Sequence, residues 1–448
     1  MSLLAEVKHE TAPTTVGSQT VSYSAGHWGS NAPKLLLHLG TQNIATAISG
    51  HADFSFGFGN ANEMGAFGFF NEDAQSSKSD TQFGVSDAYV ASHLNDSAGI
   101  SEAAAVTGLA AAESTLYWST VTGDGRTFGH LALGGDAIEE ISIDVIETPL
   151  ATGEVAYTSP GFQPDALIAI FGSTTANIPY RVSGSFVGMG VSDGTTDASC
   201  YQTALNNQST SNTRSLMRDE LISIYAWNGN AQETATVTSL DETGYTLDWT
   251  FSLGGTAREV LILAIKGPAA KVIRATQPAT DSTVSRDAGF APKAALGLMS
   301  MKPASSDSTD HSRMGVGFWA AESDGQASGG ALDEDGQSVT NTDSFYSTAH
   351  GLKNYDHSQT VVGQATVSAD GDDLTETWTN TDGSAEYGHA WLVLGDTPVV
   401  TPPGHSGRID AAQVYQDGTV AGMTAQAGFS AGAVTRSKTI AGQIIGAT

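Results

Sequence analysis

The side chains best suited to catalysis or metal binding in this sequence are histidines, and five of them fall within one stretch: His27, His38, His51, His93 and His130. A zinc or catalytic site needs ligands that converge from close spacing, such as two histidines four residues apart on a helix. None of the five has such a neighbour on a helical pattern. His130 and His389 occupy the same place in a repeat described below, where another copy has Val260. A histidine that valine can replace is structural, and we therefore expect no metal site.

Nucleophilic, calcium-binding and glycosidase chemistry would each need other groupings of side chains. Cys200, the single cysteine, lies in a Ser/Thr/Asp-rich stretch without an identifiable base. The acidic turns at Asp193, Asp333 and Asp370 lack the alternating acids, sixth glycine and twelfth glutamate of a calcium loop. A carboxylate pair for glycoside hydrolysis can assemble from distant strands, which leaves a glycan-degrading enzyme as a third hypothesis. We expect no enzyme and no cofactor.

The charge balance argues against two classes of partner. The 448 residues include 48 Asp or Glu and only 19 Lys or Arg, a net charge of −29. Binding to nucleic acids or to anionic membranes needs clustered cations. No run of apolar residues is long enough to cross a bilayer, and the N-terminus lacks a secretory leader pattern. We expect no nucleic acid partner, no membrane insertion and, with one cysteine, no intrachain disulfide.

Four landmarks recur in the same order in three copies. Each copy opens with a glycine, an aromatic residue, a proline and an apolar run, beginning at Gly26, Gly161 and Gly289. A Gly-x-Gly pair, a tryptophan and a closing apolar strand follow. The recurring glycines and tryptophans are Gly57, Gly59, Gly188, Gly190, Gly315, Gly317, Trp118, Trp249 and Trp378. The tryptophans lie 131 and 129 residues apart, which is the size of a domain and predicts a triplicated domain.

Each copy is predicted to be an antiparallel β-sandwich or jelly roll, which makes the chain all-β. Apolar and β-branched residues alternate with polar ones, as in Tyr245–Phe251, and no window sustains a long capped helical period. The Gly-x-Gly pair is predicted to bend a strand at a sandwich corner. A tryptophan repeated three times is more often a core residue than a platform for sugars. The predicted parts are an N-terminal arm (1–25), three sandwiches (26–150, 151–275 and 276–396), and a linker with a C-terminal assembly arm (397–448).

Three segments resemble a β-rich module of structural proteins from tailed viruses of bacteria and archaea: Gly161–Ile168, Asp241–Leu247 and Phe128–Gly135. The resemblance covers most of residues 20–396. The third copy departs from it, since Gly395 is followed by Asp396 instead of a second glycine. The resemblance implies a component of the virion that is assembled in the host cytoplasm and brings no catalytic residues.

The sequence therefore favours a virion protein exposed on the particle as a head decoration, turret or fibre component. Such a protein would act by self-assembly and arm exchange in a homo-oligomer, as a trimer or a ring, with other virion proteins as partners. The alternative is a carbohydrate-binding adhesion protein, on a viral tail or a cell surface, that holds a host glycan.

Overall fold

A computed structural model describes residues 1–42, 48–96, 99–172, 180–183, 185–226, 230–252, 255, 257–300, 311–323, 325–356, 358–379, 383, 387–396, 439–440 and 443–444. The chain divides into two compact units, Met1–Pro398 and Val399–Thr448. In the second unit, β33 (Thr439–Ile440) pairs antiparallel with β34 (Gln443–Ile444). The rest of the expected C-terminal assembly arm, 397–448, lies outside the described residues.

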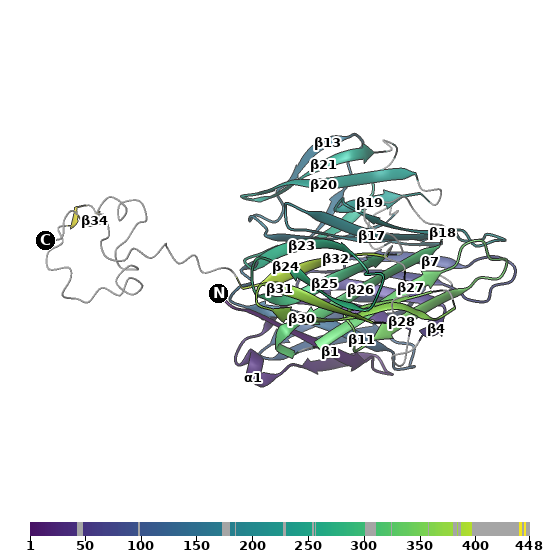
Figure 1. The fold of residues 1–448 in the computed structure, drawn as a ribbon, viewed down its shortest axis with the longest axis horizontal. Helices are drawn as coiled ribbons and strands as arrows, with labels where there is room; N and C mark the ends of the chain where they lie inside the picture. Colours follow the sequence, from purple (N-terminus) through teal and green to yellow (C-terminus); the bar gives the residue numbers. More distant parts are fainter. Residues whose placement is uncertain are drawn as a thin grey trace. The chain divides into compact units, whose positions relative to one another are not determined.

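Each copy consists of a six-stranded antiparallel sheet and a four-stranded one, which confirms the predicted fold of three tandem β-sandwiches (Figure 1). The first copy contains, in sheet order, β1 (Leu3–Thr11), β11 (Thr127–Gly135), β3 (Pro33–Thr41), β5 (Ala52–Gly59), β6 (Met64–Asn71) and β7 (Thr81–Ser86), with β2 (Gly17–Ser22), β10 (Glu113–Thr120), β9 (Ile100–Ala110) and β8 (Ala91–Leu94). The second contains β12 (Glu140–Glu147), β22 (Glu259–Lys266), β14 (Ala166–Gly172), β16 (Ser185–Ser192), β17 (Asp197–Ala204) and β18 (Thr213–Arg218), with β13 (Gly153–Tyr157), β21 (Gly244–Ser252), β20 (Ala231–Asp241) and β19 (Ile222–Tyr225). The third contains β23 (Ala269–Thr276), β32 (Gly388–Gly395), β25 (Pro292–Ser300), β26 (Ser312–Ala320), β27 (Gly325–Asp333) and β28 (Thr342–Ser347), with β24 (Ser282–Asp287), β31 (Asp373–Thr379), β30 (Val361–Asp370) and β29 (Leu352–Tyr355).

Two short strands cross from one copy to the next. β4 (Ile48–Gly50) of the first copy pairs with β28 of the third, and β15 (Tyr180–Ser183) of the second pairs with β7 of the first. The described helical elements are one turn each, α1 (Ala25–Trp28) and η1 (Ala321–Ser323). Backbone hydrogen bonds between strands therefore connect neighbouring copies.

The expected N-terminal arm, 1–25, is instead part of the first sandwich. β1 pairs along its whole length with β11, the last strand of the same copy, and β2 forms an edge of the four-stranded sheet. The second and third copies begin the same way, with β12 on β22 and β23 on β32, so both start before the expected boundaries at 151 and 276. Edge strands carry many polar residues because one side faces solvent, and this polarity in residues 1–25 resembles that of an arm.

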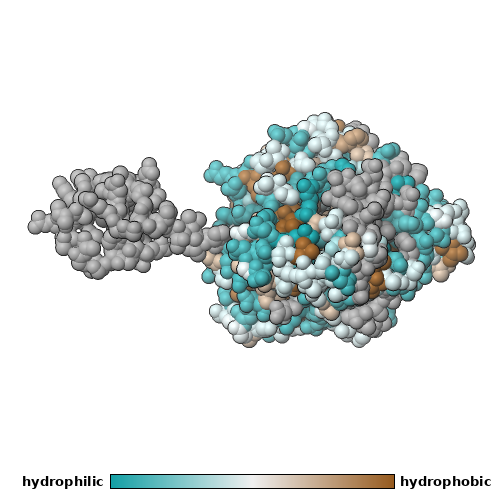
Figure 2. All heavy atoms as spheres, in the orientation of Figure 1, coloured by the Kyte–Doolittle hydropathy of each residue, from teal (hydrophilic) through white to brown (hydrophobic). Residues whose placement is uncertain are grey.

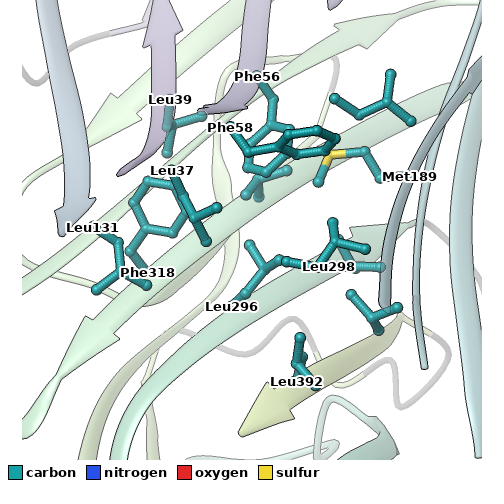
Figure 3. Packing of buried hydrophobic residues seen from close by; sticks show 14 of the residues in the cluster. Leu37, Leu39, Phe56, Phe58, Leu131, Met189, Leu296, Leu298, Phe318 and Leu392 are labelled. Atoms are coloured by element: carbon teal, nitrogen blue, oxygen red, sulfur yellow. The ribbon is translucent and has the colours of Figure 1, made fainter. Parts of the chain in front are cut away.

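Hydrophobic packing joins the three copies into one unit. Each sandwich encloses its own apolar cluster, and a fourth cluster draws on the six-stranded sheets of all three copies. Figure 3 shows members of this cluster from all three copies: Phe56 and Leu131 of the first, Met189 of the second, and Leu296 and Leu392 of the third. The central strands of these sheets are buried on both faces, which explains their nearly continuous apolar sequences. Burial of each large side chain contributes about 1.5–3 kcal/mol, so the shared core holds the copies together.

The surface is mostly polar. On the face drawn in Figure 2, hydrophobic residues form small patches among hydrophilic ones. Tyr117 and Phe251 are among the large apolar side chains that stay exposed. Within the described part of the chain, no helix has the length and apolar character needed to cross a membrane.

Candidate functional site

The three landmark tryptophans occupy one structural position and are all buried. Trp118 lies opposite Ala104, Trp249 opposite Ala235, and Trp378 opposite Ala365, in each case across the two central strands of the four-stranded sheet. Each side chain is at most 1% exposed. None of the three can stack on a sugar without unfolding its sandwich.

The landmark glycines are explained by close backbone contact. A Cβ atom on Gly57, Gly190 or Gly317 would lie 2.2, 1.8 or 1.7 Å from the carbonyl oxygen of Val90, Leu221 or Gly351. These three glycines are equivalent by strand pairing, so the Gly-x-Gly pairs align with an offset of two residues in the first copy. Gly59, Gly188 and Gly315 lie instead against the side chains of Met64, Phe171 and Met299. The glycines thus admit a neighbouring backbone in the middle of a strand, where a bend at a sandwich corner was expected.

The contacts between copies form a closed cycle, which we call the junction ring. In each contact a threonine backbone N–H donates to the side-chain oxygen of an Asn or Asp in the next copy: Thr81 to Asn206 Oδ1 (2.9 Å), Thr213 to Asp335 Oδ1 (2.8 Å) and Thr342 to Asp73 Oδ1 (3.0 Å). The first copy donates to the second, the second to the third, and the third to the first. A head-to-tail contact that closes after three steps is the geometry of a cyclic trimer, here within one chain.

A second set of bonds repeats around the junction ring. A hydroxyl two residues before each threonine donates to a backbone carbonyl of the next copy: Ser79 to Leu205 (2.6 Å), Ser211 to Glu334 (2.6 Å) and Thr340 to Glu72 (2.7 Å). Each hydroxyl also accepts from the backbone N–H of Gln208, Gln337 or Gln75, respectively. Ala74, Asn207 and Gly336 have φ of 59°, 61° and 76°, so all three loops share one left-handed turn. Sequence reasoning missed this site, because its Ser, Thr, Asn and Asp residues look like ordinary turns.

Three of the five histidines singled out in the sequence, His38, His93 and His130, pack together in the first sandwich, with ring centres 6.5 Å apart for His38 and His93 and 5.0 Å apart for His38 and His130. His38 and His130 are fully buried in the first sandwich, with Nδ1 of His38 2.9 Å from Nε2 of His130. His93 Nδ1 lies 2.8 Å from Asp53 Oδ1, and Arg126 donates to the other Asp53 oxygen at 2.5 Å. Burial opposes ionisation of Asp53, but His93 and Arg126 hold the pKa of that carboxyl below its usual value.

Strand pairing also corrects the expected equivalence of His130 and His389. His130 pairs with His38, Ile262 with Ala169, and Trp391 with Gly297, and these pairs are the equivalent ones. Val260 and His389 lie two residues earlier on their strands, at the position of Phe128. The same space in the three sandwiches therefore holds two imidazoles, an alanine with an isoleucine, or a glycine with a tryptophan.

The third sandwich buries a carboxylate among aromatic donors. Glu376 accepts from Trp378 Nε1 (3.0 Å) and Trp391 Nε1 (2.8 Å), and His389 Nε2 lies 2.7 Å from its Oε1. Burial raises the pKa of this acid, but His389 and Arg286 outweigh it and lower the value to about 2. The carboxylate is an internal cross-link of the core.

Neither Cys200 nor Ser192, the candidate nucleophiles among the described residues, is placed to attack a substrate. Burial raises the pKa of the Cys200 thiol to about 12, so the thiolate that attacks substrates does not form. Two Gly-x-Ser-x-Gly patterns, the motif of a nucleophilic serine, occur in the sequence, at Gly190–Gly194 and Gly428–Gly432. Ser192 of the first is fully buried and accepts from the backbone N–H of Gly194, while the second lies outside the described residues.

Metal binding has no suitable geometry either. Within the described ranges, no group of three or more His, Cys, Asp or Glu side chains is arranged to hold a metal ion. The described acidic side chains at Asp193, Asp333 and Asp370 therefore belong to no such group. An open hollow of about 400 Å³ lies at the contact of the first two copies, lined by Gln75, Ser77, Lys78, Ser79, Asp80, Asn206 and Asn207. No protein-family model matches the chain, and no curated protein or solved structure matches it either.

Proposed function

We propose that the chain is a non-enzymatic structural protein on the outside of a tailed virus particle, as a head decoration, turret or fibre component. The observation that supports this proposal best is the junction ring, because three sandwiches closed into one threefold block make a rigid building unit. Symmetric shells and appendages are built from such units. The sequence resemblance of Gly161–Ile168 and its companion segments points the same way.

The two ends of the block differ in a way that suits attachment. The backbone N–H of Leu3 donates to Asp396 Oδ1 at 2.7 Å, so the first and last strands meet at one end of the sheets. The junction ring lies at the opposite strand ends, beyond Asn71 and Thr81. The last described strand of the block and its junction ring therefore lie at opposite ends of the sheets.

Residues 397–448 are the segment that we propose for arm exchange. They contain three Lys or Arg and two Asp, whereas the other residues contain 16 basic and 46 acidic side chains. A nearly neutral tail escapes the repulsion that separates two acidic blocks. We propose that this tail makes the contacts to other copies and to other virion proteins.

Two experiments test the proposal. Antibodies against residues 1–396, applied to gradient-purified particles from the producing culture, should place gold label on the particle exterior. Light scattering should find the full chain as an oligomer and a chain ending at Pro398 as a monomer. Virus particles in which mass spectrometry finds none of the protein would contradict the proposed location. The same number of chains per assembly for the full and the shortened protein would contradict arm exchange.

The adhesion alternative rests on the polar hollow at the contact of the first two copies. Its amides, hydroxyls, Lys78 and Asp80 could bind the hydroxyls and charge of a sugar. A glycan array with the full chain tests this, with Lys78→Ala as the variant. Binding that the variant loses would favour adhesion over a purely structural role.

A further inference from the structure

The three contacts of the junction ring differ at one position that matters for charge. The last residue of β6, β17 and β27 is Asn71, Ala204 and Asp333, and each pairs with the threonine of its own copy. Asp333 is fully buried. One of its carboxyl oxygens accepts from Asn71 Nδ2 of the first copy, and its backbone carbonyl accepts from Thr213 Oγ1 of the second at 2.9 Å. All three copies therefore meet at this residue.

The second carboxyl oxygen of Asp333, Oδ1, has no hydrogen-bond partner among the described residues. A buried acceptor without a partner is costly, and far more costly when it carries charge. The equivalent residues of the other copies avoid this cost, because Asn71 carries a neutral amide and Ala204 only a methyl group. A neutral carboxyl at Asp333 would therefore cost less free energy in the folded state than a charged one.

The charged groups around Asp333 increase that cost. Asp73, Glu334 and Asp335 face it with like charge. The nearby imidazoles of His51 and His311 are held by the adjacent loops, since their Nδ1 atoms accept from the backbone N–H groups of Asp73 (2.9 Å) and Asp335 (3.1 Å).

The remaining charged groups lie on the strands beside Asp333. Asp343 follows Thr342 on β28, and burial, with Asp73 adding to it, raises the pKa of Asp343 to about 6. Arg313 on β26 lies over the Tyr387 ring, 4.9 Å from its centre, and Arg214 follows Thr213 on β18. The carboxylates that disfavour a charge on Asp333 are those of Asp335, Asp73 and Glu334.

We propose that Asp333 is a proton-operated latch, neutral when the three copies are closed on one another and loosening the junction ring when it ionises. The latch acts within one chain and needs no partner. Ionisation would leave a buried negative charge among three other carboxylates, and the least costly response is to open the loops and let water in. The loops that would open are Glu72–Gln75, Leu205–Gln208 and Glu334–Gln337.

The direction of the pH effect follows from the surroundings of the carboxyl. Burial, with Asp335, Asp73 and Glu334 adding to it, raises the pKa of Asp333 well above its usual value. A group whose pKa is higher in the folded than in the unfolded state stabilises the fold fully below the unfolded value, about 4 for Asp, and loses this effect as pH rises through the folded value. The ring should therefore be tightest in mild acid and looser toward alkaline pH.

The test compares the wild-type chain with Asp333→Asn, which mimics the neutral acid, and with Asp333→Ala, which copies Ala204. Hydrogen exchange of the three loops, corrected for the intrinsic pH dependence, is measured from pH 5 to pH 9. We expect loop protection in the wild type to fall at least tenfold over this range, and in both variants to fall clearly less, because they keep Asp343 but lack the Asp333 carboxyl. Asp370→Asn, which removes an exposed carboxylate from a distant turn, is the control and should behave like the wild type.

Equal pH dependence in the wild type and in Asp333→Asn would overturn the proposal. If Asp333→Asn failed to fold, the Asp333→Ala variant would decide in the same way, because the second copy already tolerates alanine at this position. Loss of loop protection in acid in place of alkali would also overturn it, because the sign would be reversed.

Discussion

The buried histidine pair of the first sandwich should make this chain sensitive to acid, and the other two copies show how to remove that sensitivity. His38 and His130 fill the space that Ala169 and Ile262 fill in the second sandwich. We therefore expect the double variant His38→Ala/His130→Ile to fold, since it copies an apolar pair that already packs at the same position of the second sandwich. It should lose most of the acid sensitivity of this core.

The size of the effect follows from the pKa of His130. Burial lowers this pKa to about 3, and burial together with His130 and His93 lowers that of His38 well below its usual value. Groups whose pKa is lower in the folded state stabilise the fold above the unfolded value, about 6.5 for His, and lose this effect as pH falls. At pH 5 the unfolded chain gains about 2 kcal/mol by protonating His130 alone. His38 contributes with the same sign.

Urea unfolding, followed by tryptophan fluorescence at pH 7.5 and pH 5, measures this difference. The wild type should lose at least about 2 kcal/mol more stability between the two pH values than the double variant does. Asp333 is present in both proteins, so its opposite effect cancels. The reciprocal variant Ala169→His/Ile262→His should gain acid sensitivity in the second sandwich. Equal losses in the wild type and the double variant would refute the reasoning.

Two further substitutions test the glycine and carboxylate arguments. Gly190→Ala would place a Cβ 1.8 Å from the Leu221 carbonyl oxygen and should cost about 3 kcal/mol or more, while Gly26→Ala, with open space around it, should be neutral in the same urea unfolding experiment. Glu376→Gln removes the buried charge and replaces one accepting oxygen with an NH2 group that faces other donors, and it should cost about 3–5 kcal/mol at pH 7. Because the pKa of Glu376 is lowered to about 2, its stabilisation is present above about pH 4.5 and lost toward pH 2, so the two proteins should converge in acid. A Glu376→Gln variant with an unchanged difference at low pH would contradict this.

The sequence was sufficient for the features that depend on local pattern. Alternation of apolar and polar residues predicts strands because side chains on a strand point to opposite faces in turn. Trp118 and its two counterparts identified three copies because a core position keeps its residue type while the surface changes. The same local reasoning could not separate a polar edge strand from an arm, and residues 1–25 show this, since Leu3 pairs with Gly135 across more than a hundred residues.

Register and assembly were decided only by the tertiary structure. A glycine or histidine two residues out of alignment still lies on the same face of its strand, so the sequence cannot reveal that His130 matches Trp391 and that Gly57 matches Gly190. The junction ring was equally hidden, because Thr213 and Asp335 meet only when three sheets pack around a shared core. Strand pairing and burial bring together groups that are far apart in sequence. The sequence alone therefore predicts the strands and the repeat. The contacts that raise the pKa of Asp333 exist only in the folded molecule.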